Sequence, residues 1–154
     1  MKTCAYLWFI YFSVIVRGDV NYTDPTTLVR IYELLSDLES LDNINEHLTR
    51  SWIHHYQTFA SAKQFLLNES VTMDSETDFV RKTYEFYKMR QSPFSLDIAY
   101  NANISRIVAS RFLVQGYNIR STLDEEKMVL DIRNVVKKHS DSQVQVQPSH
   151  SIKI

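Results

Sequence analysis

The chain has little of what cross-linked or β-rich proteins usually need. Its 154 residues include one cysteine, two glycines and three prolines. A single cysteine, Cys4, cannot form an internal disulfide, which excludes the disulfide-framework families of toxins, inhibitors and growth factors. Folds with many short strands need tight turns, usually built with Gly, Pro, Asn or Asp. The scarcity of glycine and proline therefore favours a few long helices.

A strong charge of either sign is also missing. Lysine and arginine number 17, aspartate and glutamate 18, and the formal net charge is −1. Without a basic run, nothing predicts binding to nucleic acid or to an anionic membrane surface. Beyond the N-terminal segment, no stretch is apolar enough for a transmembrane helix of about 20 residues. The sequence therefore predicts no nucleic-acid partner and no membrane span.

Recognisable catalytic and metal-binding motifs are absent too. The chain has no nucleophile elbow, no glycine-rich phosphate loop and no cysteine after Cys4. A helical zinc site needs histidines one turn apart. Here His54 and His55 are adjacent, and His47 lies two turns before His54, about 10 Å along a helix axis. We therefore expect no enzyme activity, no metal site and no cofactor.

The N-terminal segment is the clearest feature that is present. Lys2 precedes an apolar run over residues 5–16, which is shorter than a membrane span and has the length of a signal-peptide core. Gly18 supplies a small residue before a cleavage site. Residues 1–18 are therefore predicted to be a signal peptide, and the protein to be secreted and extracellular. The alternative is a buried N-terminal helix or an uncleaved anchor.

Apolar residues recur at helical spacing through residues 19–139, the predicted domain. Asp24 is the expected N-cap and Pro25 the first helical residue. Gly116 is expected to be a left-handed C-cap, and Thr122 with Glu125 a capping box. Helices are predicted over residues 25–41, 44–67, 75–91, 94–115 and 122–138. The predicted fold is therefore all-α, a single helical bundle of four to five helices without disulfides.

Two boundaries stay open. The spacing continues across the first break, so one helix over residues 25–67 is an alternative to two. Residues 140–154 are polar and predicted to be a disordered C-terminal tail, although Val144 and Val146 alternate with glutamines as in an edge strand. Lys137-Lys138 fits either the end of a helix or a dibasic processing site.

Aromatic side chains provide the candidate binding residues. Trp52, Tyr56 and Phe59 share one face of the second predicted helix and are expected in its core. Alternatively, they line a cavity for an apolar ligand or form an exposed patch that binds a protein. Leu130, on the polar side of the last helix, is the candidate for a contact outside the core.

Three sequons predict N-glycosylation where they are exposed, at Asn21, Asn68 and Asn103. The first two flank predicted helices, whereas Asn103 falls inside one. The leading hypothesis is a secreted glycoprotein acting as a non-enzymatic protein-binding factor, a ligand, effector or modulator, for an unknown extracellular protein. The alternative is an extracellular carrier of a small apolar molecule in an aromatic-lined cavity between helices.

Overall fold

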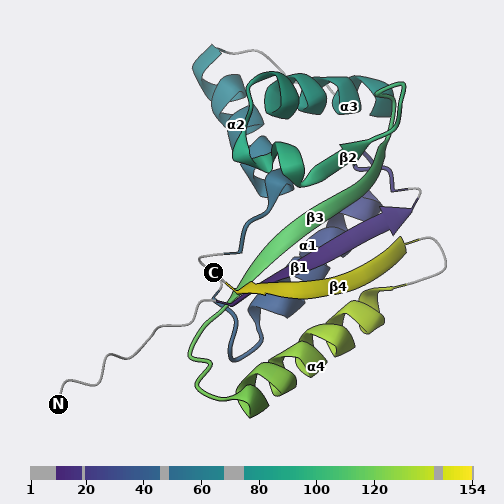
Figure 1. Ribbon diagram of the computed structural model, residues 1–154. Coiled ribbons are helices and arrows are strands. Elements are labelled where there is room, and N and C mark those ends of the chain that lie inside the picture. The colour runs from purple at the N-terminus through teal and green to yellow at the C-terminus, as the bar shows by residue number, and fades with distance from the viewer. Residues whose placement is uncertain (1–9, 19, 46–48, 68–74, 141–143, 154) are drawn as a thin grey trace.

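A four-stranded sheet organises the molecule. The computed structural model describes residues 10–18, 20–45, 49–67, 75–140 and 144–153. The strands β1 (Ile10–Gly18), β2 (Ile98–Tyr100), β3 (Ile107–Gly116) and β4 (Val144–Lys153) lie in the order β2-β3-β1-β4. Every neighbouring pair is antiparallel. The prediction of an all-α helical bundle is therefore wrong, and the fold is mixed α/β (Figure 1).

Helices connect and cover these strands. The α-helices are α1 (Pro25–Glu39), α2 (Trp52–Leu67), α3 (Glu76–Tyr84) and α4 (Thr122–His139). The π-helix η2 (Glu85–Met89) continues α3, and the 3₁₀-helix η3 (Pro93–Leu96) leads into β2. The series β1-α1-β2-β3-α4-β4 has the connection order of a split βαβ arrangement. The segment from α2 to η3 is an insertion between α1 and β2.

Strand β1 comes from the segment that was predicted to be a signal peptide. It pairs with β3 from Ile10 opposite Gly116 to Arg17 opposite Ala109, and with β4 along its other edge. Alternate residues of a strand point to the same face. Phe12, Val14 and Val16 accordingly face the helices and are between 0% and 3% exposed. Cleavage after Gly18 stays a prediction, and it would remove this inner strand.

The predicted helix over residues 94–115 is wrong, because this stretch forms η3 and the β2–β3 hairpin. The side-chain oxygen of Asn101 accepts hydrogen bonds from the backbone nitrogens of Ser105 (2.9 Å) and Arg106 (3.1 Å), which fixes the turn. Within β3, Ser110, Phe112 and Val114 are buried at every second position. Burial at every second residue is the pattern of a strand with one face in the core, and not that of the predicted helix.

The C-terminal segment was also predicted wrongly as a disordered tail. Residues 144–153 form β4, which pairs with β1 from Val144 opposite Gly18 to Lys153 opposite Ile10. The edge strand that valine–glutamine alternation offered as an alternative is the observed structure. Lys137 and Lys138 lie in the last turn of α4.

The helical predictions over residues 25–41, 75–91 and 122–138 are confirmed with small shifts, whereas the helix predicted over residues 44–67 begins only at Trp52. Helix α1 begins at Pro25, and the Asp24 carboxylate accepts from the backbone nitrogen of Thr27 at 2.9 Å. The prediction of two separate helices is confirmed and the continuous alternative is wrong, since Ile44 and Arg50 form β-bridges to β3 between them. The N-cap of α4 is Ser121, one residue before the predicted Thr122.

Gly116 serves close packing rather than the predicted C-cap. It ends β3, and a Cβ atom there would lie 2.8 Å from the sulfur of Met128 in α4. Glycine at this position lets α4 approach the sheet.

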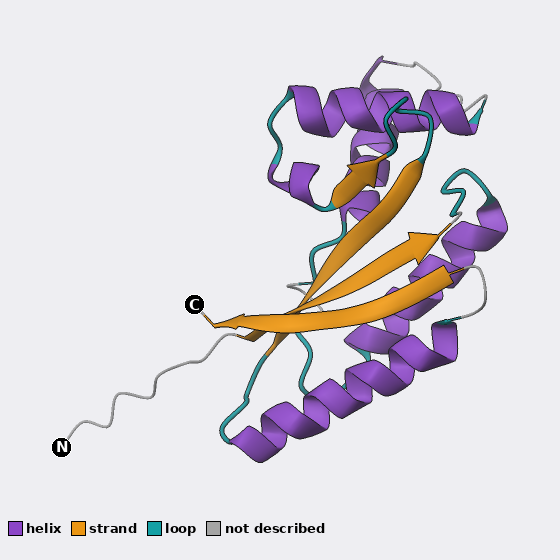
Figure 2. Ribbon diagram, turned by 45° about the vertical axis from the view of Figure 1, so that its right-hand side comes forward, coloured by secondary structure: helices purple, strands orange, loops and turns teal. Residues whose placement is uncertain are grey.

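The helices divide into two groups. Figure 2 shows α1 and α4 along one side of β3, β1 and β4, while α2 and α3 gather at the β2 end. The core lies between the sheet and α1 and α4 and continues into the inserted helices. Among the described residues, no helix combines the length and apolarity needed to cross a membrane.

Candidate binding surface

A layer of buried aromatic side chains holds the inserted helices together. Trp52 is 0% exposed and makes edge contacts with Tyr22 (5.2 Å between ring centroids) and Tyr87 (6.3 Å). The Tyr87 hydroxyl donates a hydrogen bond of 2.6 Å to the backbone oxygen of Trp52. Burial raises the pKa of Tyr87, so this phenol remains a proton donor at neutral pH. Tyr56, 3% exposed, packs edge-on against Phe79 at 5.5 Å.

Above this layer lies a second set of rings that reaches the surface, which we name the aromatic strip. It consists of His55 and Phe59 of α2, Phe86 of η2 and Phe94 of η3. Ring centroids are 4.2 Å apart for Phe59 and Phe86, 5.6 Å for Phe86 and His55, and 4.6 Å for His55 and Phe94. His55 is exposed and the three phenylalanines are half-buried. The strip is therefore a continuous row of ring contacts that is partly exposed to solvent.

Arginines flank the aromatic strip at both ends. The guanidinium carbon of Arg90 lies 5.3 Å from the centre of the Phe86 ring and 5.9 Å from that of Phe59. At the other end, Arg50 lies 5.4 Å from the centre of Phe94. Both arrangements are within the range of cation–π attraction. The strip thus presents aromatic faces between two positive charges.

Arg50 also joins the strip to the sheet through Asp97. Its Nη2 lies 2.8 Å from Oδ2 of Asp97, while Arg111 of β3 donates from Nε (2.9 Å) and Nη2 (2.6 Å) to Oδ1. The Asp97 side chain is 1% exposed, whereas those of Arg50 and Arg111 are 36% and 31% exposed. A buried carboxylate needs such partners. Two cations share one anion, so the cluster has a net charge of +1.

The π-helix η2 explains how the strip is built. A π-helical turn is wider than an α-helical one, and such turns occur frequently at functional sites. Phe86 and Tyr87 are neighbours in sequence, yet both contact Tyr56 of α2, at 5.8 and 6.4 Å. One ring stays at the surface and the other becomes core. Met89 of η2 (72%) and Leu96 of η3 (78%), from the same two elements as Phe86 and Phe94, are also exposed.

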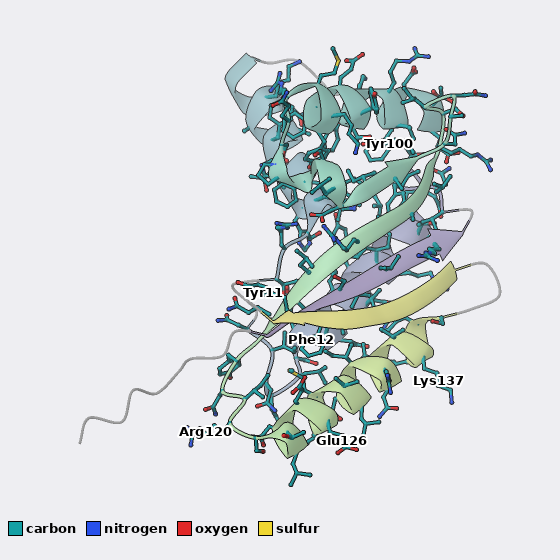
Figure 3. All side chains as sticks on the ribbon, viewed as in Figure 1. Tyr11, Phe12, Tyr100, Arg120, Glu126 and Lys137 are labelled. Atoms are coloured by element: carbon teal, nitrogen blue, oxygen red, sulfur yellow. The ribbon has the colours of Figure 1, made fainter. Side chains whose placement is uncertain are left out.

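The structure separates the predicted binding residues. Phe59 belongs to the aromatic strip, whereas Trp52 and Tyr56 lie beneath it and have almost no exposed surface. Leu130 is 50% exposed on α4. Figure 3 shows α4, with Glu126 and Lys137, at the opposite end of the molecule from Tyr100 and the inserted helices. Leu130 is therefore not part of this surface.

Sequence reasoning missed the arginines and His55 as members of the site. Arg50 reaches Phe94 only because the segment before α2 pairs with β3, through Arg50 and Leu113. His54, which the sequence offers equally, stacks instead on Tyr32 of α1 at 5.0 Å. No local pattern in the sequence distinguishes the two histidines.

The sequons fall in different settings. The Asn21 side-chain oxygen accepts hydrogen bonds from the nitrogen (2.9 Å) and hydroxyl (2.6 Å) of Thr23, and Asn21 is half-buried. Asn103 is exposed in the turn between β2 and β3, not inside a helix as predicted. Asn68 lies outside the described residues. Glycosylation of all three stays a prediction.

No protein-family model matches the chain, and no solved structure matches it significantly. Function is therefore argued from the surface itself.

Proposed function

We propose that the protein is a non-enzymatic protein-binding factor and that the aromatic strip, with Arg50 and Arg90, is its contact surface. The observation that carries the proposal is the row of four partly exposed, contacting rings between two arginines. Aromatic and arginine side chains are enriched in protein interfaces and among the residues that dominate binding energy.

The layer beneath the strip supports this role. Trp52, Tyr56 and Tyr87 are buried and hold α2 against η2 through ring contacts. Rings already fixed in place lose little conformational freedom when a partner binds, which favours affinity.

The same contacts weigh against the carrier hypothesis. A carrier of an apolar molecule needs a cavity lined by its aromatic side chains. Here Trp52, Tyr56 and Tyr87 pack on one another instead of facing a shared space. Native mass spectrometry tests the alternative, because a carrier would retain a small molecule through purification.

Site-specific photocrosslinking tests the proposal. Benzoylphenylalanine replaces Phe59 or Phe94 in one pair of variants and Leu130 in the control, and the proteins are expressed in their natural host. We expect positions 59 and 94 to crosslink the same partner and position 130 not to. Crosslinking that is equal at all three positions would refute the assigned surface.

The identified partner then allows a quantitative test. Phe59→Ala and Phe94→Ala each remove a central ring, and each should weaken binding of the purified partner about tenfold or more. Leu130→Ala, which removes an exposed apolar side chain of α4, is the matched control. Unchanged affinity in both phenylalanine variants would exclude the aromatic strip as the contact.

An extracellular setting remains part of the proposal. It is supported by the three sequons. Since cleavage after Gly18 would remove β1, we infer that residues 10–18 stay in the folded protein. Glycans on Asn103 together with an intact β1 segment, both read by mass spectrometry of the natural protein, would support this setting. Unmodified sequons throughout would count against it.

A further inference from the structure

The sheet has a second face, opposite the one that packs on α1 and α4. We name it the open face and define it by Ile15 and Arg17 of β1 and Ala109, Arg111 and Leu113 of β3. Ile15 is paired with Arg111 and Arg17 with Ala109, so apolar and basic residues alternate across the two strands. Arg17 is exposed and the other four residues are half-buried, whereas Ser13 and Gln115 of the same two strands are buried, so the open face is limited to these five residues. Within the described structure, Figure 2 shows no helix lying along this side of β3, β1 and β4.

Among the five residues that define the open face, the charged side chains are all positive. None of the four strands contains an aspartate or a glutamate. Asp97, which pairs with Arg111 and Arg50, is itself 1% exposed. Among the residues that define this face and its border at Arg50, the charged groups that reach solvent are therefore the guanidinium groups of Arg17, Arg111 and Arg50.

We propose that the open face binds an acidic segment of the partner protein, alongside the aromatic strip. This inference rests on the proposed function and specifies the chemistry of the partner. Arg50 contacts both Phe94 and Asp97, so it belongs to the strip and borders the open face. Guanidinium groups bind carboxylates through paired hydrogen bonds, and charge complementarity selects among partners. A single partner therefore covers both surfaces with aromatic and acidic contacts.

A protein segment fits this face better than a nucleic acid or a membrane. Binding to phosphate backbones and anionic lipids depends on many cations acting together. Here Ile15 and Leu113 lie among the arginines, and the whole chain has a net charge of −1. Alternating apolar and acidic side chains, as in an extended peptide, match this pattern.

Fluorescence anisotropy with three synthetic peptides tests the inference. The probe alternates glutamate with phenylalanine, and the two comparison peptides carry serine or lysine in place of glutamate. The full chain should bind the glutamate peptide most tightly and the lysine peptide most weakly, and rising salt should remove the difference.

Arg17 gives the cleanest variant, because it is exposed and its loss leaves the Asp97 cluster intact. Arg17→Ala should weaken the glutamate peptide roughly two- to fivefold, the range of an exposed ion pair. Arg17→Glu should weaken it further. Arg133→Ala, which removes an exposed arginine of α4 instead, should leave the affinity unchanged.

The outcomes distinguish this inference from the proposed function. Equal affinity for the three peptides, or equal effects of Arg17→Ala and Arg133→Ala, would overturn the acidic-segment inference. Binding to phosphatidylserine vesicles or duplex DNA without preference for the glutamate peptide would also overturn it. In either case, the proposed protein-binding function would still be supported if Phe59→Ala weakened binding of the crosslinked partner. If Phe59→Ala left that binding unchanged, the aromatic strip would be refuted as the contact surface.

Discussion

At the scale of single residues, burial separates side chains that look equivalent in the sequence. Trp52, Tyr56 and Phe59 recur on one helical face, and all three do turn toward α3 and η2. Trp52 and Tyr56 are enclosed, while Phe59 stays half-buried near the end of the packed region. Spacing thus predicts the face of the helix, but the distance to the covering element decides whether a residue is core or surface.

Truncating Trp52 and Phe59 checks this distinction. Trp52→Ala should lower the free energy of unfolding by about 3–5 kcal/mol, because it leaves a cavity in a fully packed site. Phe59→Ala should lower it by about 1 kcal/mol, the typical cost of a point substitution. Chemical denaturation followed by circular dichroism measures both. Equal costs would mean that the two rings are equally buried.

Asp37 should make stability depend on pH on the acid side. Its Oδ2 accepts a hydrogen bond from Lys138 Nζ at 2.7 Å and lies 2.8 Å from His139 Nε2. These two contacts join the end of α4 to α1. Lys138, followed by His139, lowers the pKa of Asp37 in the folded protein. A lowered folded pKa adds stability above the unfolded value of about 4, and this stability is lost as pH falls through the folded pKa.

Asp37→Asn therefore should melt at a lower temperature than the natural chain at pH 7. The gap should close once the pH is below the folded pKa. Thermal melts over an acid pH series measure this, and Glu126→Gln, at an exposed position of α4, is the control. A gap that persists unchanged into strong acid would show that the carboxylate charge is not what stabilises the α1–α4 contact.

At the scale of elements, the sequence predicts helices well where caps and periodicity agree. Helix α1 has Asp24 and Pro25 at its start and a buried stripe of leucines and Ile31. The helix prediction fails at residues 98–116, because short strands rich in apolar residues can satisfy helical spacing too. The turn is made by Asn101 and needs no glycine or proline, so the scarcity of these residues was misleading.

The N-terminus of α4 gives a test at this scale. Ser121 accepts a hydrogen bond from the nitrogen of Asp124 at 3.2 Å, and the Asp124 carboxylate accepts from the nitrogen of Ser121 at 2.9 Å. Ser121→Ala should therefore cost about 1 kcal/mol of stability, as is usual for an N-cap. Thr122→Ala should cost much less, because Thr122 is the first helical residue. The opposite ranking in thermal unfolding would restore the predicted cap at Thr122.

At the scale of the whole molecule, the decisive residues are those at the ends of the chain. An apolar run of this length fits a signal-peptide core, a buried helix or a buried strand equally well. Only the pairing of β1 with both β3 and β4 decides for a strand. Such contacts join residues that are far apart in the sequence, such as Arg17 with Ala109 and Ile10 with Lys153, and no local pattern encodes them. The open face and its arginines exist only once this sheet has formed.

The position of β1 is the central claim, and one comparison tests it most directly. The full chain and a chain that begins at Asp19 are purified from the same host, and their melting is followed by circular dichroism. The full chain should melt cooperatively. The shorter chain should show no cooperative transition, because it lacks the strand that carries Phe12, Val14 and Val16 and bonds to both neighbours. If the shorter chain melts cooperatively with the same spectrum and midpoint, residues 10–18 are not part of the fold.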